Sequence, residues 1–265
     1  MTAFPPQSVL DRFGTAGVPV PLSGGQGQSV AAGALVLKPV LDAEECEWLG
    51  TVLSAMPESP EFRLARPVRS RDWHFVEEGF QAFEWVAGTA SPRGRWEEVL
   101  KTARAFHAAL KNVAPHPLLA RRQHRWAFAD RVSFGEAAIA PSSEAIRPLA
   151  ETLAPWGVPT TDPPTLIHGD LSGNLLFADG LPPAVIDVSP YYRPEIFAQA
   201  IIVVDAWLWH GEEEALASCL RGPNPRGYLA RALLFRLAAL NEHGRENPAV
   251  LEELPLFERV VGWVT

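Results

Sequence analysis

The chain has 265 residues, of which 47% are hydrophobic and 20% are charged, a composition that fits a globular protein and excludes a largely disordered one. Lysine and arginine number 23 and aspartate and glutamate number 31, so the net charge is −8, which argues against nucleic acid as the main partner and suits a cationic small molecule. The two cysteines, Cys46 and Cys219, match no metal or disulfide pattern, the first residues lack a secretion signal, and no apolar run reaches membrane length. We therefore expect a cytoplasmic protein whose partner is neither a membrane nor a nucleic acid.

The N-terminal part predicts a short helix and then strands joined by a glycine-rich turn. The helix is Ser8–Phe13, the turn lies within Leu22–Val30, and a strand follows at Ala34–Lys38. Glycines between strands let backbone N–H groups approach phosphates closely, and a lysine on the next strand can reach phosphates as a point charge. The Walker A pattern is absent, and a turn of this kind, taken alone, is more often an ordinary hairpin.

A helix and two more strands follow. Asp42 is a predicted N-cap, the helix is Ala43–Met56, and Pro57 ends it. The basic stretch Arg63–Arg71 indicates an irregular connection. The predicted strands are Trp73–Val76 and Gly79–Trp85.

Beyond Pro92 the apolar residues recur at helical spacing. His107 fits a packed core histidine better than a ligand. The basic run Arg121–Trp126 fits a surface patch better than a nucleic-acid site, given the net negative charge. Trp96, Leu100, Ala103, Phe106 and Leu110 carry that spacing and predict a helix, and the predicted helices that follow are Ser142–Leu153, Ala198–Trp209, Glu212–Leu220, Tyr228–Asn241 and about Ala249–Trp263.

The most informative stretch is Ile167–Pro190, which carries two carboxylates and an amide at the ends of short apolar runs. Asp170 lies in a glycine-flanked loop, Asn174 opens the run that follows, and Asp187 ends the next one. Turn-forming residues separate the two runs, which predicts a hairpin that returns Asp187 beside Asn174. One carboxylate that accepts a hydroxyl proton, together with an amide and a carboxylate that hold Mg²⁺, is what phosphoryl transfer requires.

The motif H-G-D, a few residues, N and then I-D resembles the catalytic and metal-binding loops of the aminoglycoside phosphotransferase family, with an actinobacterial branch of it most alike. The resemblance implies transfer of a phosphoryl group from ATP or GTP to a hydroxyl of a small molecule. It makes Asp170 the catalytic base and Asn174 and Asp187 the Mg²⁺ ligands. It makes Lys38 the phosphate-binding lysine.

The same resemblance implies an α+β, two-lobed, protein-kinase-like fold, with a small antiparallel-sheet N-lobe at residues 1–88 and a mostly helical C-lobe at 89–265. Glu45 is the helix acid that would pair with Lys38, although it also fits a solvated acid in the first turn of its helix. The backbone of Glu84 and Val86 would bind adenine at the hinge. Candidate phosphate contacts in the glycine-rich turn are Gly25, Gly27 and Ser29.

Two departures from the family pattern leave alternatives open. Three residues separate Asp170 from Asn174 where the family has four, and the acid that usually braces the loop is missing, with Asp205 or Glu195 as substitutes. These departures favour a rival reading, a kinase-like pseudoenzyme that binds a nucleotide or a protein partner without turnover. A hydrolase that uses His168 and Asp170 is a third reading, which lacks a nucleophile or metal cluster.

Overall fold

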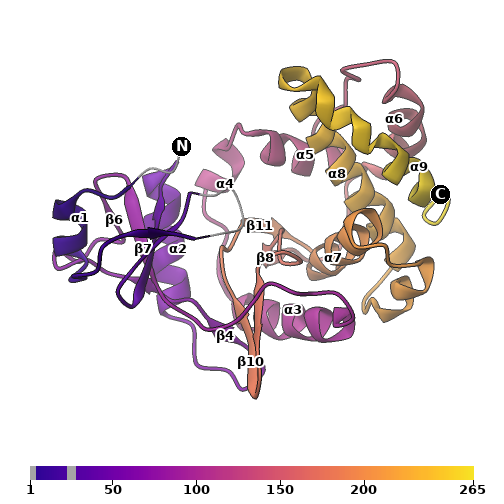
Figure 1. The fold of residues 1–265 in the computed structure, drawn as a ribbon. Coiled ribbons are helices and arrows are strands. Elements are labelled where there is room, and N and C mark those ends of the chain that lie inside the picture. The colour runs from indigo at the N-terminus through magenta and orange to yellow at the C-terminus, as the bar shows by residue number, and fades with distance from the viewer. Residues whose placement is uncertain (1–3, 23–27) are drawn as a thin grey trace. The chain divides into compact units, whose positions relative to one another are not determined.

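The computed structural model describes residues 4–22 and 28–265. The chain divides into two compact units, Met1–Ala90 with Leu175–Asp187, and Ser91–Asn174 with Val188–Thr265. The first is built mainly on strands and the second mainly on helices (Figure 1). The predictions for Gly25 and Gly27 fall outside the described residues.

Within the described residues, the larger of the two sheets in the first unit is antiparallel. It has the order β1-β2-β3-β7-β5, and β6 also pairs with β7. Pairing between β3 and β7 runs from Leu35 opposite Glu84 to Pro39 opposite Phe80. Side chains from alternate positions are buried against helix α1. The bounds are α1 Gln7–Arg12, β1 Val20–Pro21, β2 Val30–Ala32, β3 Leu35–Pro39, β5 Pro67–Val68, β6 Val76–Glu77 and β7 Phe80–Glu84.

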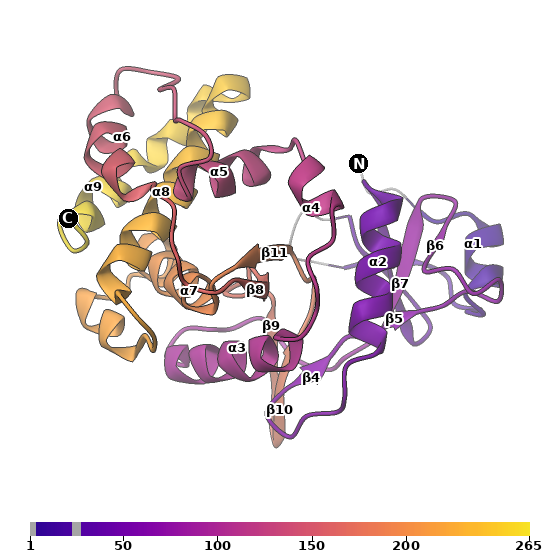
Figure 2. The same ribbon diagram turned by 180° about the vertical axis from the view of Figure 1, so that it is seen from behind.

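Helix α2 (Ala43–Ser54) crosses the strands of this sheet (Figure 2). It begins at the predicted residue, because the Asp42 carboxylate accepts the backbone N–H of Glu45 at 3.1 Å and so satisfies a donor of the first turn. Gly50 packs against the Phe75 ring so closely that a Cβ would lie 2.5 Å from it. The glycine therefore sets how near the helix approaches the chain that leads into β6.

The predicted hairpin is present. β9 (Leu175–Ala178) and β10 (Leu181–Val185) pair antiparallel around Gly180, which has a left-handed φ of +71°. Pro182 and Pro183, expected in the turn, lie instead inside β10. The register shifts there, because proline lacks the N–H that a regular ladder needs. β10 also pairs in parallel with β4 (Arg63–Leu64), which lies in the stretch expected to be irregular.

The second unit packs helices around α7 (Glu195–Trp209), whose residues Ile196–Leu208 are all buried. A short pair of strands, β8 (Thr165–His168) and β11 (Pro190–Arg193), contacts it. Helix α8 (Pro225–Glu246) packs along α7 and α5. The other helices are α3 Trp96–Leu110, α4 Leu118–Arg121, α5 Arg125–Ser133, α6 Arg147–Leu153, α9 Leu254–Val261 and the 3₁₀ turns η1 Ala154–Trp156, η2 Glu214–Cys219 and η3 Pro248–Glu253.

Most of the expected helices are present, but three differ from the structure. The first part of the helix expected at about Ala249–Trp263 is the 3₁₀ turn η3, and α9 follows it. The helix expected from Ser142 begins at Arg147, where Pro148 occupies the first turn, the position in which proline is tolerated. The segment expected to be an α-helix at Glu212–Leu220 is a 3₁₀ turn.

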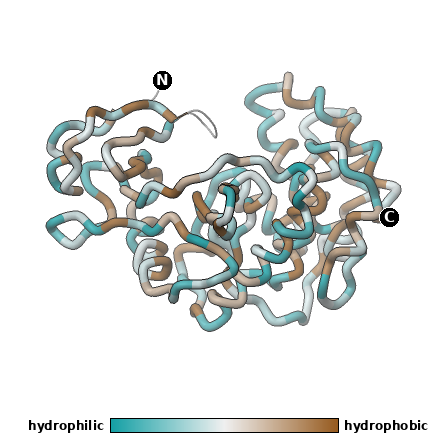
Figure 3. The backbone as a smooth tube through the Cα atoms, turned by 60° about the horizontal axis from the view of Figure 1, so that its bottom comes forward, coloured by the Kyte–Doolittle hydropathy of each residue, from teal (hydrophilic) through white to brown (hydrophobic). Residues whose placement is uncertain are grey.

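Hydrophobic stretches of the chain are short and interrupted by hydrophilic ones in both units (Figure 3). Among the helices of residues 4–22 and 28–265, none has the length and apolar character that crossing a membrane requires.

Candidate active site

The loop that carries Asp170 follows β8 and is organised by His168. This histidine is buried, and its Nδ1 accepts the backbone N–H of Asp170 at 3.1 Å and that of Ser189 at 3.3 Å. A ring nitrogen that accepts hydrogen bonds from two N–H groups carries no proton itself. The single ring proton of the neutral imidazole is therefore on Nε2. His168 therefore shapes the loop through hydrogen bonds, as the sequence analysis expects.

Asn174 closes the shortened loop. Its side-chain Nδ2 donates to the Asp170 carbonyl at 2.6 Å and lies 3.4 Å from the Asp170 carboxylate, and its backbone N–H bonds the Leu171 carbonyl at 3.0 Å. Gly173 does not adopt a positive φ, and a Cβ there would meet nothing within 4 Å. The loop closes through a turn and the Asn174 amide, and the glycine is not what permits it. With Nδ2 directed at the loop, the amide oxygen is the atom that a metal ion would use.

A buried arginine, which the sequence analysis missed, holds the catalytic-base candidate. Arg236 of α8 donates from Nη2 to Asp170 Oδ1 at 2.9 Å and to Asp205 Oδ2 at 2.6 Å. Ser172 Oγ donates to the same Asp205 oxygen at 2.5 Å. The exposed fractions of the Arg236 and Asp205 side chains are 4% and 3%, whereas that of Asp170 is 51%. The carboxylate of Asp170 is thus half exposed and anchored from its buried side.

The opposite charges in this network stabilise one another's ionised forms. Burial lowers the pKa of Arg236, but Asp205 and then Asp170 outweigh it, and the net pKa lies above the ordinary value. Burial raises the pKa of Asp205, and Arg236 opposes that rise. Asp205 therefore braces the loop through Ser172 and Arg236. A single basic residue inside the apolar run A-L-L-F-R-L-A was the sequence signal for Arg236.

Glu195, the other candidate brace, acts on the loop by a different route. His107 is buried, as expected for a core histidine, and its Nε2 accepts the backbone N–H of His168 at 3.1 Å. The other ring nitrogen, Nδ1, lies 3.5 Å from Glu195 Oε1. Both acids that the sequence analysis named thus reach the loop.

In the first unit, Lys38 and Asp187 form an ion pair of 3.0 Å. Lys38 lies on β3 opposite Gln81, and Asp187 lies two residues beyond the end of β10. Asp187 has a φ of +51°, a left-handed conformation that is uncommon for a residue other than glycine and concentrates at functional sites. Its side chain is 58% exposed and that of Lys38 is 17% exposed.

The remaining predicted residues lie on the same unit. Glu45 is in the first turn of α2, and its negative charge raises the pKa of the neighbouring Cys46. Glu84 ends β7, its N–H bonded to the Arg66 carbonyl at 2.8 Å, and Val86 follows it. The Ser29 carbonyl, just before β2, accepts the Leu22 N–H at 3.0 Å. Their nucleotide contacts stay predictions.

The oxygen ligands offered by Asn174 and Asp187 suit Mg²⁺ better than a metal ion whose ligands must all come from the protein. Within residues 4–22 and 28–265, no group of three or more His, Cys, Asp or Glu side chains could hold a metal ion. Magnesium typically uses one or two carboxylate or amide oxygens and completes its shell with waters and substrate phosphates. The Asn174 amide oxygen and the Asp187 carboxylate are ligands of that type.

No protein-family model matches the sequence, and no curated protein sequence matches it. The structure does resemble solved structures of known proteins. An aminoglycoside phosphotransferase from Alicyclobacillus acidocaldarius is 15% identical with a TM-score of 0.65, covering 99% of this chain and 94% of its own. Spectinomycin phosphotransferase in its AMP complex is 13% identical with a TM-score of 0.63, covering 97% and 96%. A microcompartment-associated aminopropanol kinase is 14% identical with a TM-score of 0.60, covering 96% and 94%.

These likenesses span nearly the whole chain on both sides and define the class of fold. The chain has the α+β, protein-kinase-like fold, and its structural neighbours are aminoglycoside phosphotransferases and a related small-molecule kinase. The predicted fold class is confirmed.

Proposed function

We propose that the protein is a small-molecule phosphotransferase, which moves the γ-phosphoryl group of ATP or GTP to a hydroxyl of its substrate. The observation that carries the proposal is the Asp170 loop. A half-exposed carboxylate is anchored from behind by Arg236, and the Asn174 amide bonds the Asp170 carbonyl at 2.6 Å. Positioning of this kind is the main contribution a protein makes to phosphoryl transfer.

Each polar residue has a distinct role in the proposal. Asp170 orients the acceptor hydroxyl and takes its proton. Lys38 binds nucleotide phosphates, and Asn174 and Asp187 hold Mg²⁺, which neutralises charge on the phosphates when bound. The ion pair between Lys38 and Asp187 supports these roles because it keeps a cation and a metal-type ligand together on the first unit.

The acceptor is a small molecule with a hydroxyl group, and a cationic one suits the net charge of −8. Among the structural neighbours, one is a complex with ADP and spectinomycin, another a complex with ADP and hygromycin B, and a third is an aminopropanol kinase. These neighbours support the class of acceptor and leave its identity to experiment.

A kinase-like pseudoenzyme is the second candidate, and the contact between Asp170 and Arg236 favours it. A carboxylate that is already bonded to a guanidinium at 2.9 Å has one oxygen less free to receive a proton. Against it stands the retention of Lys38, Asp170, Asn174 and Asp187 together.

The deciding experiment has two arms. The melting temperature is measured with millimolar ATP or GTP, with and without Mg²⁺, and we expect a rise that is larger with Mg²⁺, since a ligand that binds the native state stabilises it by mass action. Nucleotide consumption is then measured with pooled amino alcohols, sugars and aminoglycosides. A melting shift without turnover on any pool supports the pseudoenzyme, and no shift with any nucleotide overturns the phosphotransferase and leaves only a pseudoenzyme that binds a protein partner.

A further inference from the structure

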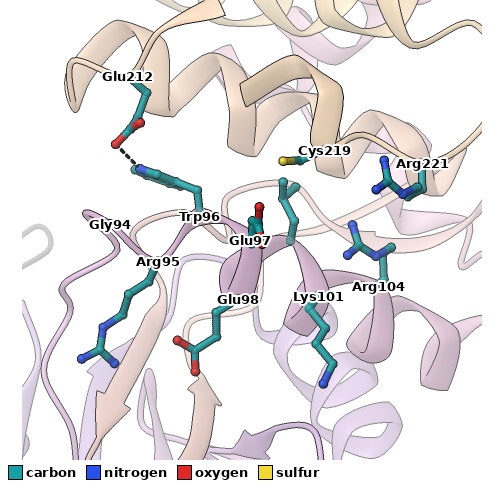
Figure 4. Close-up of a pocket in the computed structure, with 11 residues that line it drawn as sticks. Gly94, Arg95, Trp96, Glu97, Glu98, Lys101, Arg104, Glu212, Cys219 and Arg221 are labelled. Carbon is teal, nitrogen blue, oxygen red and sulfur yellow. Dashed lines mark hydrogen bonds between the residues drawn. The ribbon is translucent and has the colours of Figure 1, made fainter. Parts of the chain in front are cut away.

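A cavity of about 770 Å³ opens in the second unit, at the N-terminal half of α3 and against the segment that joins α7 to α8 (Figure 4). Its size is in the range of small-molecule sites. Neither Asp170 nor Asn174 lines it, so it is separate from the candidate active site.

One side of this cavity is cationic. Figure 4 shows the side chains of Arg104 and Arg221 close together on the side where Cys219 lies, whereas Lys101 points away from them. The cavity is also lined by the acids Glu97, Glu98 and Glu212. In the part of the chain that the structure describes, neither arginine has a carboxylate oxygen within 4 Å. Arg104 donates to the Gln199 amide oxygen at 3.1 Å, and Arg221 donates to the carbonyls of Ser218 and Leu220. Two guanidinium groups without a carboxylate partner, on a chain of net charge −8, mark a local site for negative charge.

We propose that this cavity binds a small molecule bearing a phosphate or carboxylate group, held by Arg104 and Arg221, and that its binding is coupled to the conformation of the Asp170 loop. Guanidinium groups bind both kinds of oxyanion through paired N–H donors. The site is an effector site, distinct from the sites for nucleotide and acceptor.

The coupling begins at Gln199, which is fully buried and uses its whole hydrogen-bonding capacity. Its amide oxygen accepts from the Arg104 side chain at 3.1 Å and from the Arg221 backbone N–H at 3.2 Å. Its amide nitrogen donates to Glu195 Oε2 at 2.7 Å and to the Arg221 carbonyl at 3.0 Å. A displacement of either arginine therefore breaks or strains a bond to a buried amide, which is costly.

From Glu195 the connection continues to the catalytic loop. Glu195 contacts His107, His107 accepts the backbone N–H of His168, and His168 accepts the backbone N–H of Asp170. Each step is a contact between groups of the second unit. An anion that draws Arg104 and Arg221 together acts, through Gln199, on Glu195, and the Glu195 carboxylate is the group that orients His107.

Cys219 provides a test of binding that needs neither nucleotide nor substrate. It lines the cavity, and the only other cysteine, Cys46, is poorly reactive because burial raises its pKa to about 12. Labelling by N-ethylmaleimide, an uncharged reagent, is followed in the folded protein with inorganic phosphate or malonate, against sodium chloride of equal ionic strength. We expect one of the two anions to slow Cys219 labelling several-fold, and the pair distinguishes a phosphate ligand from a dicarboxylate.

Matched variants decide whether the two arginines are responsible for the protection of Cys219. Arg104→Gln and Arg221→Gln should each abolish the protection, whereas Lys111→Gln, which removes an exposed cation just beyond α3, should retain it. Protection that survives in both arginine variants, or its absence with both anions in the wild type, overturns the site.

The coupling is tested by hydrogen exchange of the backbone amides of His168 and Asp170. The anion that protects Cys219 should slow their exchange several-fold in the wild type. Glu195→Gln, a change at a residue that does not line the cavity and that keeps an acceptor oxygen for Gln199, should keep the Cys219 protection and lose the response of the loop. Binding without any change of exchange in the wild type overturns the coupling, and neither readout depends on phosphotransfer.

Discussion

The two acidic residues most closely tied to the proposed chemistry, Asp170 and Asp187, are held in opposite ways. Asp170 is backed by Arg236, whose side chain is 4% exposed, and through it by Asp205 and Ser172. Asp187 has a left-handed backbone, a side chain that is 58% exposed and one ion pair, to Lys38. The first arrangement fixes a carboxylate in place, and the second leaves a carboxylate free to exchange its lysine for a metal ion. The difference matches the two proposed roles. Asp170 is a base that must be held in position, and Asp187 is a ligand that must bind and release a metal ion.

The largest effect expected is on turnover. Asp170→Asn should lower the rate of phosphoryl transfer by about 10²–10⁴ and spare nucleotide binding, since it removes the proton acceptor alone. Asp187→Asn should instead weaken Mg²⁺-dependent nucleotide binding, measured by titration with and without Mg²⁺. An equal loss of binding in the two variants would show that the roles are misassigned.

The second effect concerns stability. Arg236→Met should destabilise the protein by about 3–5 kcal/mol, because it leaves the buried Asp205 carboxylate without its cation. Lys38→Met, the matched change at a pair whose carboxylate is solvent-exposed and stays hydrated when the lysine is lost, should cost no more than about 1 kcal/mol. Urea unfolding of the two variants measures both, and similar losses would contradict the contrast between the two sites.

The third effect lies in the shortened loop. Ser172→Ala removes the hydrogen bond to Asp205 and should cost about 1–3 kcal/mol. Gly173→Ala should be neutral or stabilise by less than about 1 kcal/mol, because the position has no positive φ and open space for a Cβ. A destabilising Gly173→Ala would show that the loop does require glycine.

The smallest effect is a pH dependence beside Asp187. Burial, and then the charges of Glu45, Asp42, Glu47 and Asp187, raise the pKa of Cys46 from 9.0 to about 12. Between those values the unfolded chain loses the thiol proton while the folded chain keeps it, so the free energy of unfolding falls as the pH rises. Cys46→Ala should unfold with a shallower loss of stability from pH 9 upward. An unchanged slope in that variant would place the pH dependence elsewhere.

Local patterns in the sequence predict much of this architecture. The capped helix at Asp42, the helix Trp96–Leu110 and the hairpin after Asn174 each follow from neighbours within a few positions, and each is present. The fold class followed from a resemblance that rests mainly on one hairpin.

What escaped prediction depends on contacts between distant segments. Arg236 and Asp170 are 66 positions apart, and nothing local to either indicates that α8 delivers a guanidinium to the loop. The parallel pairing of Arg63 with Ala184 joins residues that are even farther apart in sequence, and the sequence around Arg63 predicts only a basic connection. The phosphate, adenine and metal contacts assigned to the first unit depend on ligands and stay predictions.

The division of the chain has a consequence for how the protein is made. The first unit is discontinuous, since Leu175–Asp187 belongs to it while the intervening 91–174 belongs to the second. During synthesis on the ribosome the N-terminal sheet therefore emerges early, but β4, which belongs to a separate sheet with β10 and β9, has no partner strand until β10 has been translated. The order of synthesis thus differs from the order of assembly, and a fragment that ends at residue 90 lacks two strands of its own unit, β9 and β10.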